Sequence, residues 1–190
     1  MLNKLPCLDK GWVALVDSNL NSMKLRDLRA DLFYGEIPTA AYKSATLTLA
    51  MKAPLFISKA LADKELRIIN APVREDLDAY LPNEGEISAH DLETSRLIAQ
   101  DMERTTAVLL INIKAYQEDG CDKYLAQLLT PVNVYTVFMV TGTFKQWKDI
   151  VEQGSSSYPM RVYLSAIQQV MTAEWMDENG KTQESDNNKQ

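Results

Sequence analysis

Residues 46–70, TLTLAMKAPLFISKALADKELRIIN, decide the fold that the sequence predicts. Residues 46–51 alternate like a strand with one buried face. Pro54 then stands where a helix can begin, because its fixed φ angle and missing N–H group suit a first helical turn. Up to about Leu66, apolar residues gather on one helical side and charged residues mainly on the other. Residues 67–70 then form a second short extended segment, so the stretch predicts a strand, a helix and another strand.

The rest of the chain adds the elements of an α/β (α+β) domain. An apolar run after Gly11 predicts a strand at 11–17, and the β-branched, aromatic run at 132–141 predicts a strand deep in a sheet. The helix at 89–118 carries a broad apolar stripe. Further helices are expected at residues 22–32, 122–129, 144–153 and 158–175. We therefore expect a small mixed β-sheet packed with a long central helix and several shorter helices.

Length and composition predict one domain in residues 1–175. The chain has 190 residues, of which 46% are hydrophobic, and this suffices for a real core. After residue 175 the chain is polar, and residues 174–190 hold five acidic and two basic residues. We expect residues 176–190 to form a disordered acidic C-terminal tail.

The two cysteines, Cys7 and Cys121, lie far apart and form no CxxC pair, which indicates reduced thiols in a cytoplasm. No apolar run is long enough to cross a membrane, and the first residues lack the apolar core of a signal peptide. The sequence predicts a soluble, cytoplasmic protein that makes no contact with a membrane.

The charge is unevenly distributed. A net charge of −6 argues against a protein that coats duplex DNA with a basic surface. Residues 43–74, however, carry six basic and only two acidic side chains. A local basic surface is therefore expected around the stretch that decides the fold.

Catalytic and metal-binding motifs are not evident. His90 is the only histidine and has no placed partner, and Asp91 with Glu93 would make a weak magnesium pair. Residues 155–157 (SSS) lack the context of a nucleophilic serine. Residues 142–145 (GTFK) follow a strand as an anion-binding turn would, but without the glycine spacing of a P-loop. No catalytic residue, metal or cofactor is predicted from the residues alone.

A cluster of aromatic and basic side chains follows the strand at 132–141. Nucleobases stack on exposed aromatic rings at about 1–3 kcal/mol each while cations follow the phosphates, so this composition suits single-stranded nucleic acid. The same rings could instead belong to the core. The cluster consists of Phe144, Lys145, Trp147, Lys148, Tyr158 and Arg161.

Several segments resemble the flavin-dependent thymidylate synthases. Residues 8–17 (LDKGWVALVD) resemble that family's opening strand, and residues 51–57 (MKAPLFI) resemble the segment before its signature. Residues 126–131 (AQLLTP) and 134–138 (VYTVF) resemble its helix, proline and central strand. The order and spacing agree over most of residues 8–170. The resemblance implies that family's (ThyX-like) α/β fold and a homo-oligomer, a dimer or a tetramer.

The family's flavin and nucleotide motifs do not carry over. Where the family has Arg-His-Arg, this chain has Asp63-Lys64-Glu65, and Val73-Arg74-Glu75 stands in place of Ser-Gly-Arg. Residues 154–160 (GSSSYPM) replace the family's Arg-Ala-Asp-Ser-His-Ala-Gln run. Because the cationic groups that hold the flavin pyrophosphate and the nucleotide phosphate are replaced, we expect neither FAD binding nor thymidylate synthesis.

Our first hypothesis is a non-catalytic protein that binds single-stranded DNA without a cofactor. Such a chain also resembles a phage-encoded single-stranded-DNA-binding cofactor of RNA polymerase, which implies action in transcription or replication in the host cytoplasm. The acidic tail could compete with DNA for the basic surface or recruit partners. The expected DNA-binding residues are Lys52, Lys59, Lys64, Arg67, Arg74, Lys145, Trp147, Lys148, Tyr158 and Arg161.

Two alternatives stay open. The first is an enzyme or sensor that keeps a modified pyrimidine-nucleotide pocket between subunits, with Tyr135, Lys145 and Arg161 near the ligand. The second is a structural or protein-binding adaptor whose surface charges hold no ligand.

Overall fold

The structure is a computed structural model that describes residues 3–18, 45–70, 77–87 and 90–186. The helix predicted at residues 22–32 lies outside these ranges, as does Arg74.

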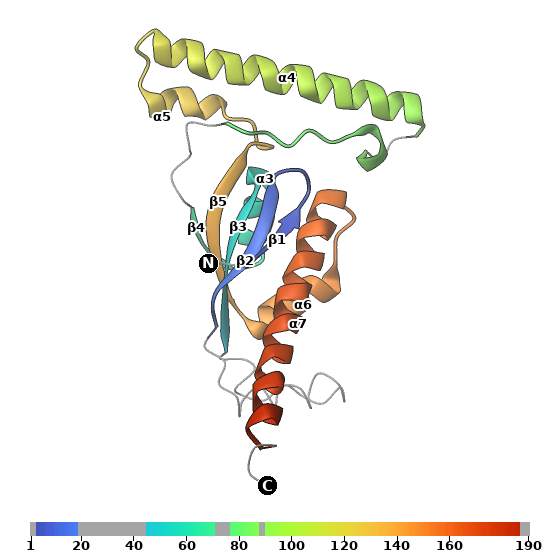
Figure 1. The fold of residues 1–190 in the computed structure, drawn as a ribbon. Helices are drawn as coiled ribbons and strands as arrows, with labels where there is room; N and C mark the ends of the chain where they lie inside the picture. Colours follow the sequence, from blue (N-terminus) through green and yellow to red (C-terminus); the bar gives the residue numbers. More distant parts are fainter. Residues whose placement is uncertain (1–2, 19–44, 71–76, 88–89, 187–190) are drawn as a thin grey trace.

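A five-stranded sheet forms the centre of the described chain (Figure 1). In chain order its strands are β1 (Lys4–Cys7), β2 (Gly11–Ser18), β3 (Thr46–Pro54), β4 (Arg67–Asn70) and β5 (Tyr135–Thr143). In space they lie in the order β1-β2-β3-β5-β4. All four neighbouring pairs are antiparallel, so the expectation of a mixed sheet is wrong for these strands. The reason is that β3 and β4, which one helix joins, do run the same way, but β5 lies between them and opposes both.

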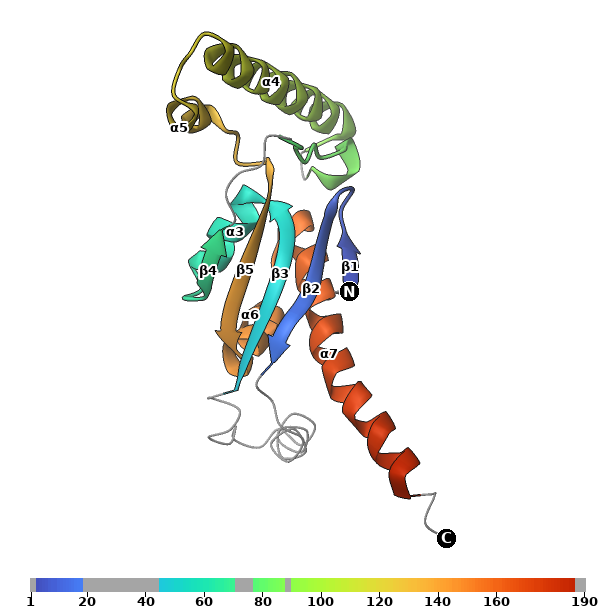
Figure 2. The same cartoon turned by 60° about the vertical axis from the view of Figure 1, so that its left-hand side comes forward.

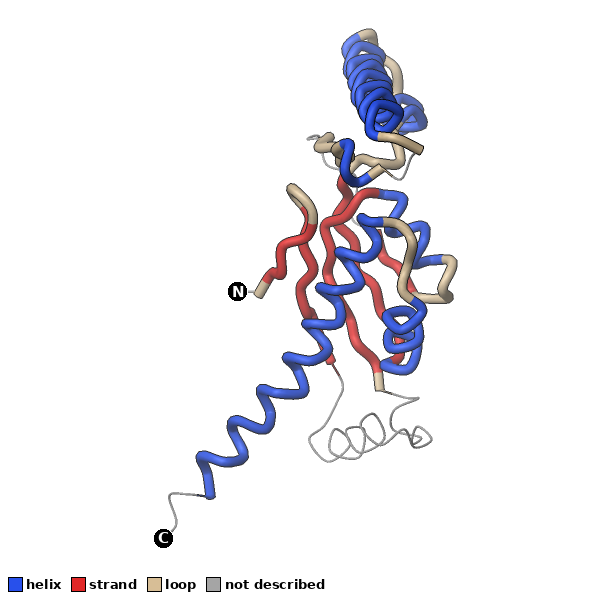
Figure 3. The backbone as a smooth tube through the Cα atoms, turned by 90° about the vertical axis from the view of Figure 1, so that its right-hand side faces the viewer, coloured by secondary structure: helices blue, strands red, loops and turns tan. Residues whose placement is uncertain are grey.

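Three helices cover one face of this sheet (Figure 3). They are α3 (Leu55–Ala62), α6 (Phe144–Gln153) and α7 (Tyr158–Asp186). As predicted, α3 begins directly after Pro54. α6 begins after Thr143, whose hydroxyl oxygen accepts a hydrogen bond from the Gln146 N–H group (3.2 Å) and caps the helix.

The end of α7 differs from the sequence-based boundary. We expected the last helix to end near residue 175, whereas α7 continues to Asp186. Glutamate, glutamine and lysine are good helix formers, so a helix already in progress can extend through this polar stretch. The separate role of residues 176–190 as an acidic tail stays a prediction.

The core lies between the sheet and these three helices. Alternate residues of β3, among them Leu47, Leu49 and Met51, are fully buried there. Trp147 of α6 and Tyr163 of α7 meet them from the helical side. Successive strand residues point to opposite faces of the sheet, so the residues between the buried ones point away from the helices.

The long helix α4 (Leu92–Glu118) does not pack on the sheet, so the expectation of a central helix is wrong. It lies at one end of the molecule with α5 (Lys123–Ala126) and the 3₁₀ turns η1 (Glu84–Glu86) and η2 (Gln127–Leu129) (Figure 1). Of its residues only Ser95, Thr106 and Ile113 are buried, so most of its apolar stripe does not belong to the core. Asp91 caps its N-terminus by accepting a hydrogen bond from the Thr94 N–H group (2.7 Å).

Candidate functional site

Four of the predicted DNA-binding lysines belong to the helical side of the molecule. Lys59 is exposed on α3, and Lys64 follows that helix and donates a hydrogen bond to the Gln153 side chain (2.7 Å). On α6, Lys145 pairs with Asp149 (2.6 Å) and Lys148 with Glu152 (3.2 Å). The two lysines of α6 are thus matched by carboxylates of the same helix.

The prediction that the Trp147 ring stacks on nucleobases is wrong. Trp147 is fully buried, and its indole N–H group donates a hydrogen bond to the Leu47 carbonyl oxygen (3.1 Å). The amphipathic spacing of α6 turns this ring toward the sheet, while Lys145 and Lys148 turn outward. Its role is therefore to hold α6 on the sheet.

Tyr158 and Arg161 form a small separate pair at the start of α7. The Arg161 guanidinium lies 5.9 Å from the centre of the Tyr158 ring and donates a hydrogen bond to the Ser156 carbonyl oxygen (2.7 Å). Tyr158 is 38% exposed. The pair keeps an accessible ring, but it also belongs to the helical side.

Lys52 and Arg67 lie on the other side of the sheet. Lys52 belongs to β3 and Arg67 to β4, and neither is part of the core cluster between sheet and helices. The described members of the predicted set therefore divide between two sides and do not form one surface.

The second face of the sheet is open. Figure 2 looks onto this face, and no described helix covers it. The residues that point to it from the five strands are absent from the core cluster. We call this surface the open face. The strand register assigns to it Lys4, Pro6, Trp12, Ala14, Asp17, Thr48, Ala50, Lys52, Arg67, Ile69, Val137, Met139 and Thr141.

The strand register arranges the open face in rows across the sheet. The middle row runs Lys4, Ala14, Ala50, Met139, Ile69. One neighbouring row runs Pro6, Trp12, Lys52, Val137, and the other runs Asp17, Thr48, Thr141, Arg67. The two alanines make the middle row low at its centre, with larger side chains in the rows on both sides.

Aromatic rings and cations meet on the open face. The Lys4 ammonium lies 4.1 Å from the centre of the Trp12 ring, and that ring is half-buried. The Lys52 ammonium lies 5.5 Å from the centre of the Tyr135 ring at the start of β5, but that ring is buried, so among the described residues Trp12 supplies the ring that a base could reach. Cations near aromatic faces are the combination that holds a phosphate backbone beside a stacked base.

Carboxylate groups lie at one end of this face. Asp78 pairs with Lys10 (3.0 Å) and Lys52 (3.2 Å), and these two hydrogen bonds hold the pKa of Asp78 below its ordinary value. The Tyr135 hydroxyl donates a hydrogen bond to Asp9 (2.5 Å). Burial, together with this carboxylate, raises the pKa of Tyr135. Lys52 is thus held by an acid, whereas Lys4 and Arg67 are exposed.

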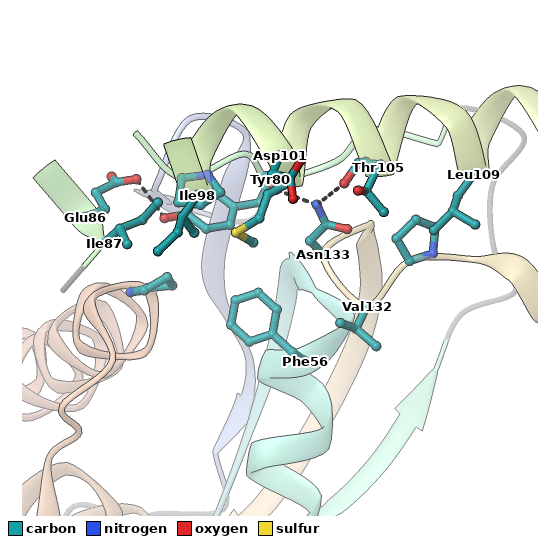
Figure 4. Close-up of a pocket in the computed structure, with 15 residues that line it drawn as sticks. Phe56, Tyr80, Glu86, Ile87, Ile98, Asp101, Thr105, Leu109, Val132 and Asn133 are labelled. Atoms are coloured by element: carbon teal, nitrogen blue, oxygen red, sulfur yellow. Dashed lines mark hydrogen bonds between the residues drawn. The ribbon is translucent and has the colours of Figure 1, made fainter. Parts of the chain in front are cut away.

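A pocket of about 660 Å³ lies between α4 and the rest of the molecule (Figure 4). Phe56 and Tyr80 supply its aromatic wall, with ring centres 6.4 Å apart. Asn133 donates hydrogen bonds to the Tyr80 carbonyl oxygen (2.8 Å) and to the Thr106 hydroxyl (3.1 Å). These bonds fix the loop before β5 under α4.

The charges of this pocket do not suit a phosphate. Glu86 and Asp101 line it, and none of its lining residues is lysine or arginine. The residues expected near a nucleotide are also dispersed: Tyr135 begins β5 and Lys145 follows its end, so a whole strand separates them. None of Tyr135, Lys145 and Arg161 lines this pocket of the single chain, and their meeting in a pocket between subunits stays a prediction.

Sequence reasoning missed Lys4 and Trp12. The strand expected at 11–17 already implied that Trp12 and Ala14 share a side, so that signal was available. Lys4 lies on a short edge strand, and edge strands of four residues leave little pattern to read. Their meeting depends on the β1–β2 pairing, which only the structure supplies.

The described residues contain no helix with the length and apolar character needed to cross a membrane. They also contain no cluster of three or more His, Cys, Asp or Glu side chains suited to a metal ion.

Comparison with solved structures supports the expected fold. The chain is similar to a UMP/dUMP methylase, PolB from Streptomyces cacaoi, in a crystal structure bound with 5-Br UMP. The TM-score is 0.66 over 86% of this chain and 88% of that chain, at 15% sequence identity. No protein-family model and no curated protein matches the sequence. The α+β fold is confirmed, and the likeness agrees with the fold that the resemblance to flavin-dependent thymidylate synthases implied.

Proposed function

We propose that this chain binds single-stranded DNA on the open face of its sheet. The observation that carries the proposal is the uncovered face with Trp12 beneath Lys4 at 4.1 Å, Lys52 beside Trp12 in the same row, and Arg67 on β4 at the opposite edge of the sheet. Sheet faces with aromatic side chains bind single strands because every base has a ring face to stack, whereas paired bases are not available.

The chemistry of the face favours binding without reaction. Its polar groups are ammonium, guanidinium and threonine hydroxyl groups with the single carboxylate of Asp17, and the Thr48 and Thr141 hydroxyls bond each other at 2.9 Å. We propose a non-catalytic role on this basis. Action as a cofactor of RNA polymerase in a phage, expected from the resemblance alone, stays a prediction.

A gel-shift series with single- and double-stranded oligonucleotides at several salt concentrations tests this proposal. We expect a preference for single strands and a steep loss of affinity with salt. Arg67→Glu should weaken binding about 3- to 10-fold for all sequences, since phosphates carry no sequence information. Lys59→Glu is the matched control: it makes the same charge change on the helical side and should have a smaller effect. Equal binding of duplex, or a larger loss with Lys59→Glu, would contradict the proposal.

Pyrimidine-nucleotide binding is the second candidate function. The fold shared with a methylase named for UMP and dUMP favours it, and that neighbour is an enzyme. Calorimetric titration with UMP and dUMP tests it directly. Binding at micromolar nucleotide, unaffected by Arg67→Glu, would support this candidate over the open face.

A further inference from the structure

α4 has a second side whose apolar residues are exposed in the monomer. Its buried residues Ser95, Thr106 and Ile113 mark the side that faces the molecule. On the opposite side, Leu97, Val108 and Ile111 are 55%, 51% and 63% exposed. Apolar side chains exposed in a row along a helix mark an interaction surface.

These residues follow the spacing of a helix-pairing seam. Residues 97, 101, 104, 108 and 111 are separated by four, three, four and three positions, which places them on one side of a helix and is the repeat of paired helices. The two polar members are Asp101 and Arg104, whose side chains are 73% and 80% exposed and 3.3 Å apart, and Asp101 also borders the pocket under α4. We call these five residues, with Thr94 one turn earlier, the α4 seam.

The α4 seam is complementary to a second α4 seam that runs antiparallel to it. An antiparallel copy with its two-fold axis between residues 101 and 104 places Leu97 opposite Val108, Thr94 opposite Ile111 and Asp101 opposite Arg104. A two-fold interface requires this self-complementarity, because each residue meets its counterpart twice. A parallel copy would instead bring Asp101 against Asp101 and Arg104 against Arg104.

We propose that α4 pairs antiparallel with α4 of a second copy of this chain, with Asp101 facing Arg104 of the partner subunit. The occupant is a second copy because the seam matches its own reverse in both apolar and charged positions. This dimer is independent of the open face, since α4 lies beyond the end of the sheet.

A charge-swap experiment tests the pairing. Asp101→Arg places arginines opposite each other at both central contacts, and Arg104→Asp places aspartates there, so each variant alone should lose the dimer. Mixed in equal amounts, the two variants should form a heterodimer, because every arginine then faces an aspartate. An intrahelical role of the pair could not produce this recovery, since each chain keeps its own like charges.

Sedimentation velocity at several protein concentrations is the measurement, with circular dichroism to show that each variant folds. Glu103→Arg, a charge reversal on the same helix but off the seam, is the matched control and should sediment like the wild type. Val108→Glu should also give a monomer. A monomeric wild type, a dimer that both single variants retain, or a mixture that stays monomeric would overturn the proposal.

Discussion

The Lys4 ammonium lies over the Trp12 ring, 4.1 Å from its centre, on the face of the sheet that no described helix covers. If bases stack on this ring, Trp12→Ala should weaken single-strand binding by about 1–3 kcal/mol. Trp12→Phe should retain part of the affinity, because phenylalanine keeps a smaller ring face. Fluorescence anisotropy with a labelled oligothymidine measures both, and Tyr158→Ala serves as a control from the helical side. A greater loss with Tyr158→Ala would move the site to α7.

Asp78 limits the positive charge available at the open face. It pairs with Lys10 and Lys52, and its lowered pKa keeps it ionised at neutral pH. Asp78→Asn should therefore release both ammonium groups and tighten single-strand binding several-fold, with a steeper dependence on salt. Asp63→Asn removes the same charge near α3 and should leave affinity unchanged. Unaltered affinity in Asp78→Asn would show that Lys52 does not contact the strand.

The same pair has a predictable effect on stability. A carboxyl group whose pKa is lower in the folded than in the unfolded protein stabilises the fold at pH values above its ordinary pKa. For Asp78 this ordinary pKa is 3.8. That contribution is lost as the pH falls through the folded pKa. It should be small, because both ion pairs are partly exposed.

Trp147 should matter for stability and not for DNA. It is fully buried and bonded to the Leu47 carbonyl oxygen, so Trp147→Ala should lower the free energy of unfolding by about 3–5 kcal/mol. Lys145→Ala, two residues away and exposed, should change it by less than about 0.5 kcal/mol. Urea denaturation of the two variants provides the comparison. A stable Trp147→Ala variant with reduced strand affinity would restore the sequence-based assignment.

This contrast shows how far the sequence could lead. Alternation and helical spacing predicted β3, α3, β5 and α6, because those patterns report which side of an element is buried. They could not say what the apolar stripe of α4 contacts, and most of the stripe proved to be exposed or only half-buried. Nor could they place Lys4 beside Trp12, since strand pairing joins residues by register and not by composition. The basic residues were found, but their division between two sides depends on topology.

The two cysteines should differ sharply in reactivity. Cys7 is 2% exposed, and burial raises the pKa of its thiol to about 12, whereas Cys121 is exposed. At pH 8 the folded protein should therefore release one equivalent of thionitrobenzoate quickly from Ellman's reagent, and Cys121→Ser should abolish this phase. Denaturant should expose the second thiol. Rapid labelling of Cys7 in folded Cys121→Ser would show that the β1 edge opens.

Gly11 is required by close packing at the turn between β1 and β2. A Cβ atom there would meet the Tyr163 hydroxyl and lie 2.7 and 2.8 Å from the carbonyl oxygens of Cys7 and Lys52. Backbone atoms cannot move aside easily, so Gly11→Ala should destabilise the fold by about 1–3 kcal/mol. Gly85→Ala is the control, since its nearest neighbour is the Asn83 side chain at 3.3 Å.

The Tyr163 hydroxyl allows a second test of the close packing at Gly11. It donates a hydrogen bond to the Lys52 carbonyl oxygen (2.8 Å), so Tyr163→Phe alone should cost about 0.5–1.5 kcal/mol. In the double variant with Gly11→Ala, the missing hydroxyl relieves one of the three close contacts. The combined loss in urea denaturation should therefore be smaller than the sum of the single losses. Additive losses would mean that the two backbone oxygens alone exclude a side chain at Gly11.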